Sequence, residues 1–157
     1  MTRPDRLRKS PRLESFDYLG PLAAHLTFVT MQRKPIFESA ELIQSCVSSI
    51  EEARSKHNAK IHAYCVMPDH VHILVEIGEG VSLQKFARLF KQLSGYRLKQ
   101  ALDSFVWQTS YYDHVLRKDE AIAKVAAYIW NNPVEAGMVS SWSSYAGSGP
   151  REALSQV

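Results

Sequence analysis

Apolar and polar positions alternate along the segment from His70 to Ile77, which predicts a half-buried strand. Side chains two residues apart on a strand project from the same face, so His70 and His72 point together to one side. The opposite face is apolar and consists of every second residue: Val71, Ile73, Val75 and Ile77. The pattern therefore predicts a strand that packs on the core and presents two imidazoles on its other face.

The same patterns predict the other elements of the chain. Branched and aromatic residues mark strands, apolar residues at steps of three and four mark helices, and proline or glycine marks the links between them. Ser82 and Asp119 are suitable N-caps for the two later helices, and Pro133 is expected to end the last one. The further predicted elements are a strand at Ala24–Met31, a helix at 38–57, a strand at Ile61–Met67, a helix after Ser82, a strand within Val106–Leu116 and a helix at Glu120–Asn132.

This order of strands and helices predicts an α+β fold, namely a ferredoxin-like split βαβ antiparallel sheet with helices on one face and a further C-terminal helix. That topology leaves the other face of the sheet available. We expect residues 1–157 to form a single domain, with a flexible basic arm at 1–20 and a tail at 146–157.

The composition agrees with an ordinary globular domain, since 45% of the 157 residues are hydrophobic and 22% are charged. The two cysteines are too few for a disulfide framework, which favours a reduced, cytoplasmic location. No apolar run approaches the roughly 18 residues of a membrane span, so we expect no membrane partner.

Basic residues gather in two places, although the net charge is only +3. The amino-terminal arm contains Arg6 and Arg8, and the helix after Ser82 carries Lys85, Arg88 and Arg97 away from its apolar stripe. These cations suit a phosphate backbone, and we consider them candidate nucleic-acid contacts. The alternative is that both segments are solvated surfaces without a partner.

The histidine pair is a candidate metal site, because two convergent imidazoles provide half of a ligand set. The alternative is a pair of hydrogen-bonded surface histidines. Asp69 points to the other side of a regular strand and is not expected to be a direct ligand. His62 and His114 are weaker candidates and more often ordinary polar residues.

The last predicted helix supplies two further candidates. Tyr128 and Asn132 lie one turn apart on a flank of that helix, away from its apolar stripe. A half-buried aromatic that anchors the helix is the alternative for Tyr128. An asparagine before proline often ends a helix, which is the alternative for Asn132.

Four segments together resemble a known family, the REP-associated tyrosine transposases, which are single-strand HUH transposases with one catalytic tyrosine. The resemblance covers most of the chain from about His25 to Tyr145, with the segments in the same order and spacing. They are Tyr64–Val75 (YCVMPDHVHILV), Trp107–Arg117 (WQTSYYDHVLR), Tyr128–Met138 (YIWNNPVEAGM) and Trp142–Tyr145 (WSSY).

The resemblance implies an HUH transposase domain that cleaves and rejoins single-stranded DNA, with REP-like hairpins as its partners. It implies that Tyr128 is the nucleophile, which forms a 5′-phosphotyrosine, and that His70, His72 and Asn132 bind a divalent metal. Mg²⁺ or Mn²⁺ suits phosphate chemistry. Two alternatives remain, a metal-dependent nuclease that activates water and a non-cutting nucleic-acid binding protein. Either a monomer or a homodimer is compatible with the sequence.

Overall fold

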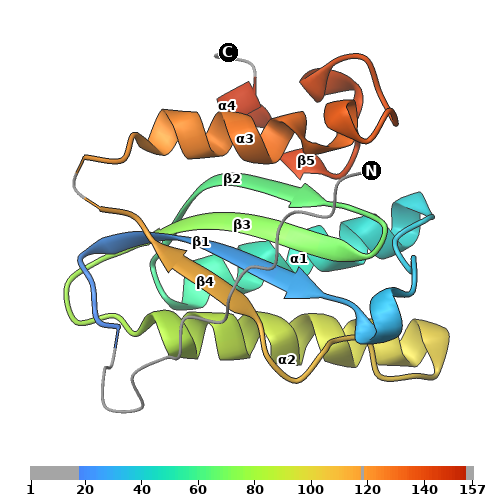
Figure 1. Ribbon diagram of the computed structural model, residues 1–157. Helices are drawn as coiled ribbons and strands as arrows, with labels where there is room; N and C mark the ends of the chain where they lie inside the picture. The colour runs from blue at the N-terminus through green and yellow to red at the C-terminus, as the bar shows by residue number, and fades with distance from the viewer. Residues whose placement is uncertain (1–17, 118, 155–157) are drawn as a thin grey trace.

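The centre of the fold is a five-stranded antiparallel sheet (Figure 1). The computed structural model describes residues 18–117 and 119–154, so Arg6, Arg8 and most of the predicted basic arm lie outside the described residues. The strands follow one another across the sheet in the order β4-β1-β3-β2-β5. Their bounds are β1 Leu22–Val29, β2 Lys60–Val66, β3 His70–Ile77, β4 Tyr112–Val115 and β5 Ser148–Gly149.

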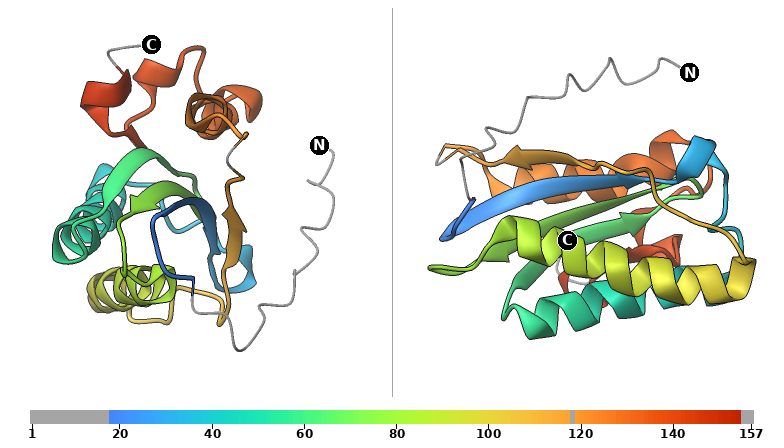
Figure 2. Two further views of the ribbon diagram at one scale, coloured as in Figure 1. Left: turned by 90° about the vertical axis from the view of Figure 1, so that its left-hand side faces the viewer. Right: turned by 90° about the horizontal axis from the view of Figure 1, so that it is seen from below.

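Helices cover both faces of this sheet (Figure 2). Helices α1 (Ala40–Lys56) and α2 (Leu83–Leu102) pack on one face, where Val71, Ile73 and Val75 of β3 are fully buried. Helix α3 (Ile122–Glu135) packs on the other face, against β2 and β3. The short elements are α4 (Arg151–Leu154) and two 3-10 turns, Met31–Arg33 and Trp142–Ser144.

The α+β antiparallel architecture confirms the predicted fold class. Strand β3 lies between β1 and β2, so the β1-α1-β2 unit is split by a third strand as the sequence predicts. The expectation that the second face stays available is wrong, because Ala126, Ile129 and Trp130 of α3 form a second core there. This face therefore combines an apolar half beneath α3 with the polar half that contains the histidines.

The helix ends correct two details of the prediction. Ser82 does cap α2, since its hydroxyl accepts a hydrogen bond from the amide of Lys85, but Asp119 does not cap α3, whose N-cap is Ala121. Pro133 lies inside α3 rather than ending it. The helix ends at Glu135, and Gly137, which follows the C-cap Ala136, has a positive φ of 73° and closes a Schellman motif that glycine favours.

Part of the predicted tail is built into the sheet. Strand β5 pairs with β2 through Tyr64 and Cys65, and Leu154 of α4 is buried in the second core. The indole nitrogen of Trp130 donates to the carbonyl of Gly149 at 2.9 Å, which ties α3 to β5. Within the described residues, no helix is both long and apolar enough to cross a membrane.

Candidate active site

The two histidines of β3 lie at the start of the strand, on the face that α3 partly covers. His72 is only 7% exposed, and its ring centroid lies 4.9 Å from that of His70. The Nδ1 of His70 donates to a carboxylate oxygen of Asp69 at 2.7 Å. Asp69 belongs to the tight connection between β2 and β3, so the hairpin itself supplies the partner that orients His70.

The neighbouring strand β1 holds His72 from the other side. The register pairs Thr27 with His72 and His25 with Leu74, which brings His25 and Thr27 onto the histidine face. The Nδ1 of His72 lies 2.9 Å from Nε2 of His25 and 3.2 Å from the hydroxyl of Thr27. One ring nitrogen of each β3 histidine is thus engaged by the protein.

Helix α3 brings Tyr128 to this cluster. The ring centroid of Tyr128 lies 6.3 Å from that of His72 and 6.1 Å from that of His25. Tyr128 is 53% exposed, so the alternative of a half-buried aromatic anchor does not describe it. The apolar stripe of α3 packs on β2 and β3 and leaves the tyrosine on the flank. A phenol and three imidazoles therefore converge beside solvent.

The electrostatics of the cluster favour neutral imidazoles. Burial lowers the pKa of His72 well below its usual value, with smaller contributions from His25 and His70. Burial, and then the nearby His114, lower the pKa of His25 to about 4. At neutral pH both rings keep a lone pair on one nitrogen, which is the state that binds a metal or accepts a hydrogen bond.

The donor atoms suit a divalent cation. In the described part of the chain, the Nε2 atoms of His70 and His72 have no hydrogen-bond partner, whereas both Nδ1 atoms are engaged. Metal-binding histidines usually have one nitrogen held in this way by a second group. Across the described residues, no group of three or more His, Cys, Asp or Glu side chains is arranged as a metal site. A third ligand would have to be of another type, such as an amide oxygen.

Asn132 is the amide that the sequence singles out. It follows Tyr128 by one turn of α3 and is half-buried, and no side-chain hydrogen bond engages it among the described residues. The preceding Asn131 has a structural role, because its side-chain oxygen accepts a hydrogen bond from the indole of Trp142 at 3.0 Å.

The basic candidates on α2 lie elsewhere. Lys85 and Arg88 are exposed on α2, which covers the opposite face of the sheet from Tyr128. Arg97 is half-buried between the helices, where it pairs with Glu52 and donates to Ser49 of α1 at 2.8 Å. The structure therefore does not bring these three cations to the histidine and tyrosine cluster.

Neither His25 nor Thr27 was singled out from the sequence, and Asp69 was considered only as a direct ligand and not as the group that orients His70. The signal for the first two was the alternation of His25 and Thr27 with Leu26 and Phe28, which puts them on one polar face of the first strand. The weaker candidates have other partners. His62 pairs with Glu76 at 2.5 Å, and His114 pairs with Glu120 at 3.0 Å.

Comparison with known proteins places the chain among transposases. The family described as "Transposase IS200 like" matches residues 20–132, which include His25, both β3 histidines, Tyr128 and Asn132. A Haemophilus influenzae protein named "Putative REP-associated tyrosine transposase" is 31% identical in an alignment of 94 positions that covers 49% of this chain and 51% of that protein. An uncharacterized protein of the same organism is 26% identical in an alignment of 98 positions that covers 48% of this chain and 54% of that protein. The aligned segments thus span about half the length of these relatives.

Solved structures share the fold. A REP-associated tyrosine transposase bound to a REP hairpin has a TM-score of 0.73 and 19% identity, and the match covers 90% of this chain and 83% of that chain. A protein of Deinococcus radiodurans R1 described as a putative transposase has a TM-score of 0.56 and 22% identity, with coverage of 73% and 92%. At these identities the likeness concerns the fold alone.

Proposed function

Because the chain belongs to the IS200-like transposase family, we propose that it cleaves and rejoins single-stranded DNA with Tyr128 as the nucleophile. One observation carries the proposal: the exposed phenol of Tyr128 lies beside His72 and His25, with ring centroids 6.3 and 6.1 Å apart. A structural anchor has no need of this position, whereas a nucleophile needs both solvent access and nearby polar groups.

The proposed reaction exchanges one phosphodiester for another. The phenol oxygen of Tyr128 attacks the phosphorus, and the bond from phosphorus to the 3′ oxygen breaks. The phenol gives up one proton, and the leaving oxygen takes up one to become a 3′ hydroxyl. The 5′ phosphate stays on Tyr128, so the energy of the broken bond is retained and the reverse attack by a 3′ hydroxyl rejoins a strand.

We propose a divalent ion, Mg²⁺ or Mn²⁺, as the cofactor, with His70, His72 and Asn132 as the residues that would hold it. When bound, such an ion supplies charge stabilisation to the phosphate oxygens during attack. The protein contributes orientation. Asp69 and His25 hold the Nδ1 atoms of the two histidines, so that their Nε2 atoms remain available.

Hairpin-forming DNA is the proposed substrate. The solved structure with the same fold, a REP-associated tyrosine transposase, is bound to a REP hairpin. The curated relative with 31% identity is named for the same class. We therefore propose that this chain acts on single strands next to REP-like hairpins.

The test is formation of a covalent adduct. The protein is incubated with a 5′- and 3′-labelled hairpin oligonucleotide and Mn²⁺, and the products are separated under denaturing conditions. We expect a protein–DNA adduct that Tyr128→Phe abolishes, while binding of the oligonucleotide persists. Tyr96→Phe is the matched control, since Tyr96 is also exposed but lies on α2.

Two results would contradict the proposal. An adduct that survives in Tyr128→Phe would assign the nucleophile to another residue. Cleavage that continues in Tyr128→Phe without any adduct, but requires His70 and His72, would identify a nuclease that uses activated water.

A further inference from the structure

Helix α2 has a strongly cationic exposed side that the proposed active site does not use. Its twenty residues include five lysines and arginines and no aspartate or glutamate. Arg97 is paired with Glu52 on α1, but Arg88 and Lys99 remain exposed. A solvated helix usually carries residues of both charge signs. The excess of positive charge on α2 therefore favours binding of an anionic partner.

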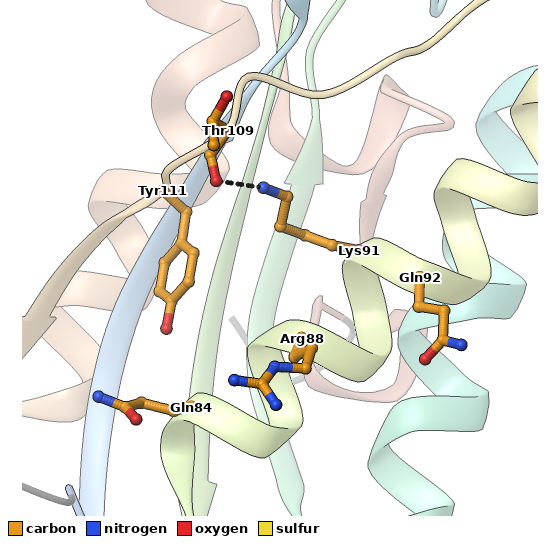
Figure 3. A pocket seen from close by; sticks show the side chains of 6 residues that line it. All are labelled: Gln84, Arg88, Lys91, Gln92, Thr109 and Tyr111. Atoms are coloured by element: carbon orange, nitrogen blue, oxygen red, sulfur yellow. Dashed lines mark hydrogen bonds between the residues drawn. The ribbon is translucent and has the colours of Figure 1, made fainter.

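A groove lies between α2 and the segment that leads into β4 (Figure 3). Its volume is about 710 Å³, and it is lined by Gln84, Arg88, Lys91, Gln92, Thr109 and Tyr111. The ammonium of Lys91 donates to the carbonyls of Gln108 at 2.7 Å and Thr109 at 3.0 Å, which fixes one wall against the other. These two hydrogen bonds therefore fix the position of α2 relative to the segment that leads into β4.

The groove continues toward the C-terminal end of α2, where two large aromatic side chains are exposed. A hollow of about 450 Å³ shares Lys91, Gln92 and Thr109 with the first and is also lined by Tyr96, Lys99 and Phe105. Tyr96 is 67% exposed and Phe105 is 73% exposed. The ammonium of Lys99 lies 4.6 Å from the centre of the Phe105 ring. A positive charge therefore lies against one exposed aromatic ring, and a second exposed ring lines the same hollow.

The charges of this α2 groove distinguish it from the other large hollow described. Among the described residues, the α2 groove is lined by three cations and no carboxylate. The hollow between α1, β2 and α4 is lined by three glutamates together with three cations. Exposed aromatic rings next to cations are the combination that binds unpaired bases and their phosphates.

We propose that the α2 groove binds a single-stranded stretch of DNA, whose bases stack on Tyr96 and Phe105 and whose phosphates face Arg88 and Lys99. This inference rests on the proposed function, because it supplies a second contact for the same substrate. The groove and Tyr128 lie on opposite faces of the sheet, and edge strand β4 lies between α2 and α3 (Figure 2). The strand bound in the groove is therefore a flank that lies outside the segment at Tyr128.

Binding is measured by fluorescence anisotropy with a labelled oligo-dT of about 16 nucleotides, long enough to span a groove of this kind. All proteins carry Tyr128→Phe, so the measurement does not depend on whether an adduct forms. We expect Tyr96→Ala with Phe105→Ala to weaken binding at least about fivefold, and Tyr96→Phe with Phe105→Tyr to preserve it. Arg88→Gln with Lys99→Gln removes two phosphate contacts and should reduce the slope of log K against log salt concentration by about 1.4.

Controls separate this groove from general charge effects. Lys34→Gln with Lys60→Gln removes two exposed cations from other elements and should leave the salt dependence closer to that of the parent protein. A blunt hairpin without single-stranded tails should bind the alanine variant and its parent equally. Thermal melting checks that the variants fold, which we expect because both aromatic rings are exposed.

The proposal would be overturned if the double alanine variant bound oligo-dT as tightly as its parent. It would also be overturned if this variant lost as much affinity for the blunt hairpin as for oligo-dT. Crosslinking with 4-thiothymidine adds an independent readout, since peptides that contain Tyr96 or Phe105 should carry the label. Labels confined to other elements would also overturn the proposal. The binding measurement is independent of the adduct experiment, because every protein in it carries Tyr128→Phe. A failure to detect the Tyr128 adduct would therefore not change the binding results.

Discussion

The Nδ1 atom of His72 lies 2.9 Å from the Nε2 atom of His25, across the β1–β3 pair. Two neutral imidazoles at this distance share one proton as donor and acceptor. If His72 donates from Nδ1, its Nε2 keeps the lone pair that a metal needs, and His25 is the acceptor. His25 on the neighbouring strand is therefore placed where it can hold His72 in the tautomer that a metal ligand needs.

Substitution of His25 is expected to weaken metal binding without removing a ligand. His25→Leu should reduce the affinity for Mn²⁺ by about 10- to 100-fold, the usual effect of losing a partner that orients a ligand. His25→Gln should recover part of it, because the amide oxygen can accept the same hydrogen bond. Isothermal titration with Mn²⁺ measures the affinity. Equal affinities for the leucine variant and the parent would rule out this role.

Asp69 is expected to act in the same way on His70. Asp69→Ala removes the acceptor 2.7 Å from Nδ1 of His70 and should lower the affinity for Mn²⁺ about tenfold. Arg33→Ala is the control, because Arg33 contacts the other carboxylate oxygen at 3.5 Å and its side chain is 61% exposed. The prediction is contradicted if Asp69→Ala and Arg33→Ala lower the affinity for Mn²⁺ equally. In that case the carboxylate of Asp69 acts through Arg33 and not through His70.

The turn that precedes β1 has no space for a side chain at Gly20. A Cβ added there would lie 2.0 Å from the carbonyl oxygen of Gly78, which is backbone and cannot rotate away. Gly20→Ala should therefore destabilise the fold by about 2 kcal/mol or more. Gly78→Ala is the matched control, since its Cβ meets no described atom within 4 Å. Urea denaturation compares them, and similar midpoints would contradict the expected clash.

The contact between α3 and β5 is expected to stabilise the second core. Trp130→Phe keeps an aromatic ring but removes the indole donor 2.9 Å from the carbonyl of Gly149. A buried acceptor left without its donor costs about 1–3 kcal/mol. Chemical denaturation should show this loss, and hydrogen exchange should become faster in β5 and its partner residues of β2. Unchanged exchange in β5 would show that another contact holds the strand.

The fold was predictable where the pattern is local. Alternation located β3 at its observed bounds, and it assigned Val71 and His72 to opposite faces. The ends of α3 were not predictable, because a proline within a helix removes only one hydrogen bond and the packing of Ile129 and Trp130 outweighs that loss. The two-residue strand β5 pairs with β2 and contacts Trp130 of α3, and these contacts between distant residues leave little local signal.

The candidate site shows the same division. Spacing alone put His70 and His72 on one face, and helical geometry put Tyr128 and Asn132 on one flank. The supporting side chains His25 and Asp69 were missed because their roles depend on which strand pairs with β3 and on how the hairpin turns. Arg97 was assigned to nucleic acid from its charge, but its neighbours Ser49 and Glu52 come from another helix.

The sequence by itself determined which side chains share a face, since strand and helix periods are properties of the backbone that hold within a few residues. Tertiary structure alone decided that the phenol of Tyr128 meets the imidazoles of β1 and β3, because strand register and the docking of α3 are set by contacts between residues far apart in the chain. Such contacts depend on the whole core, which no local window of the sequence contains.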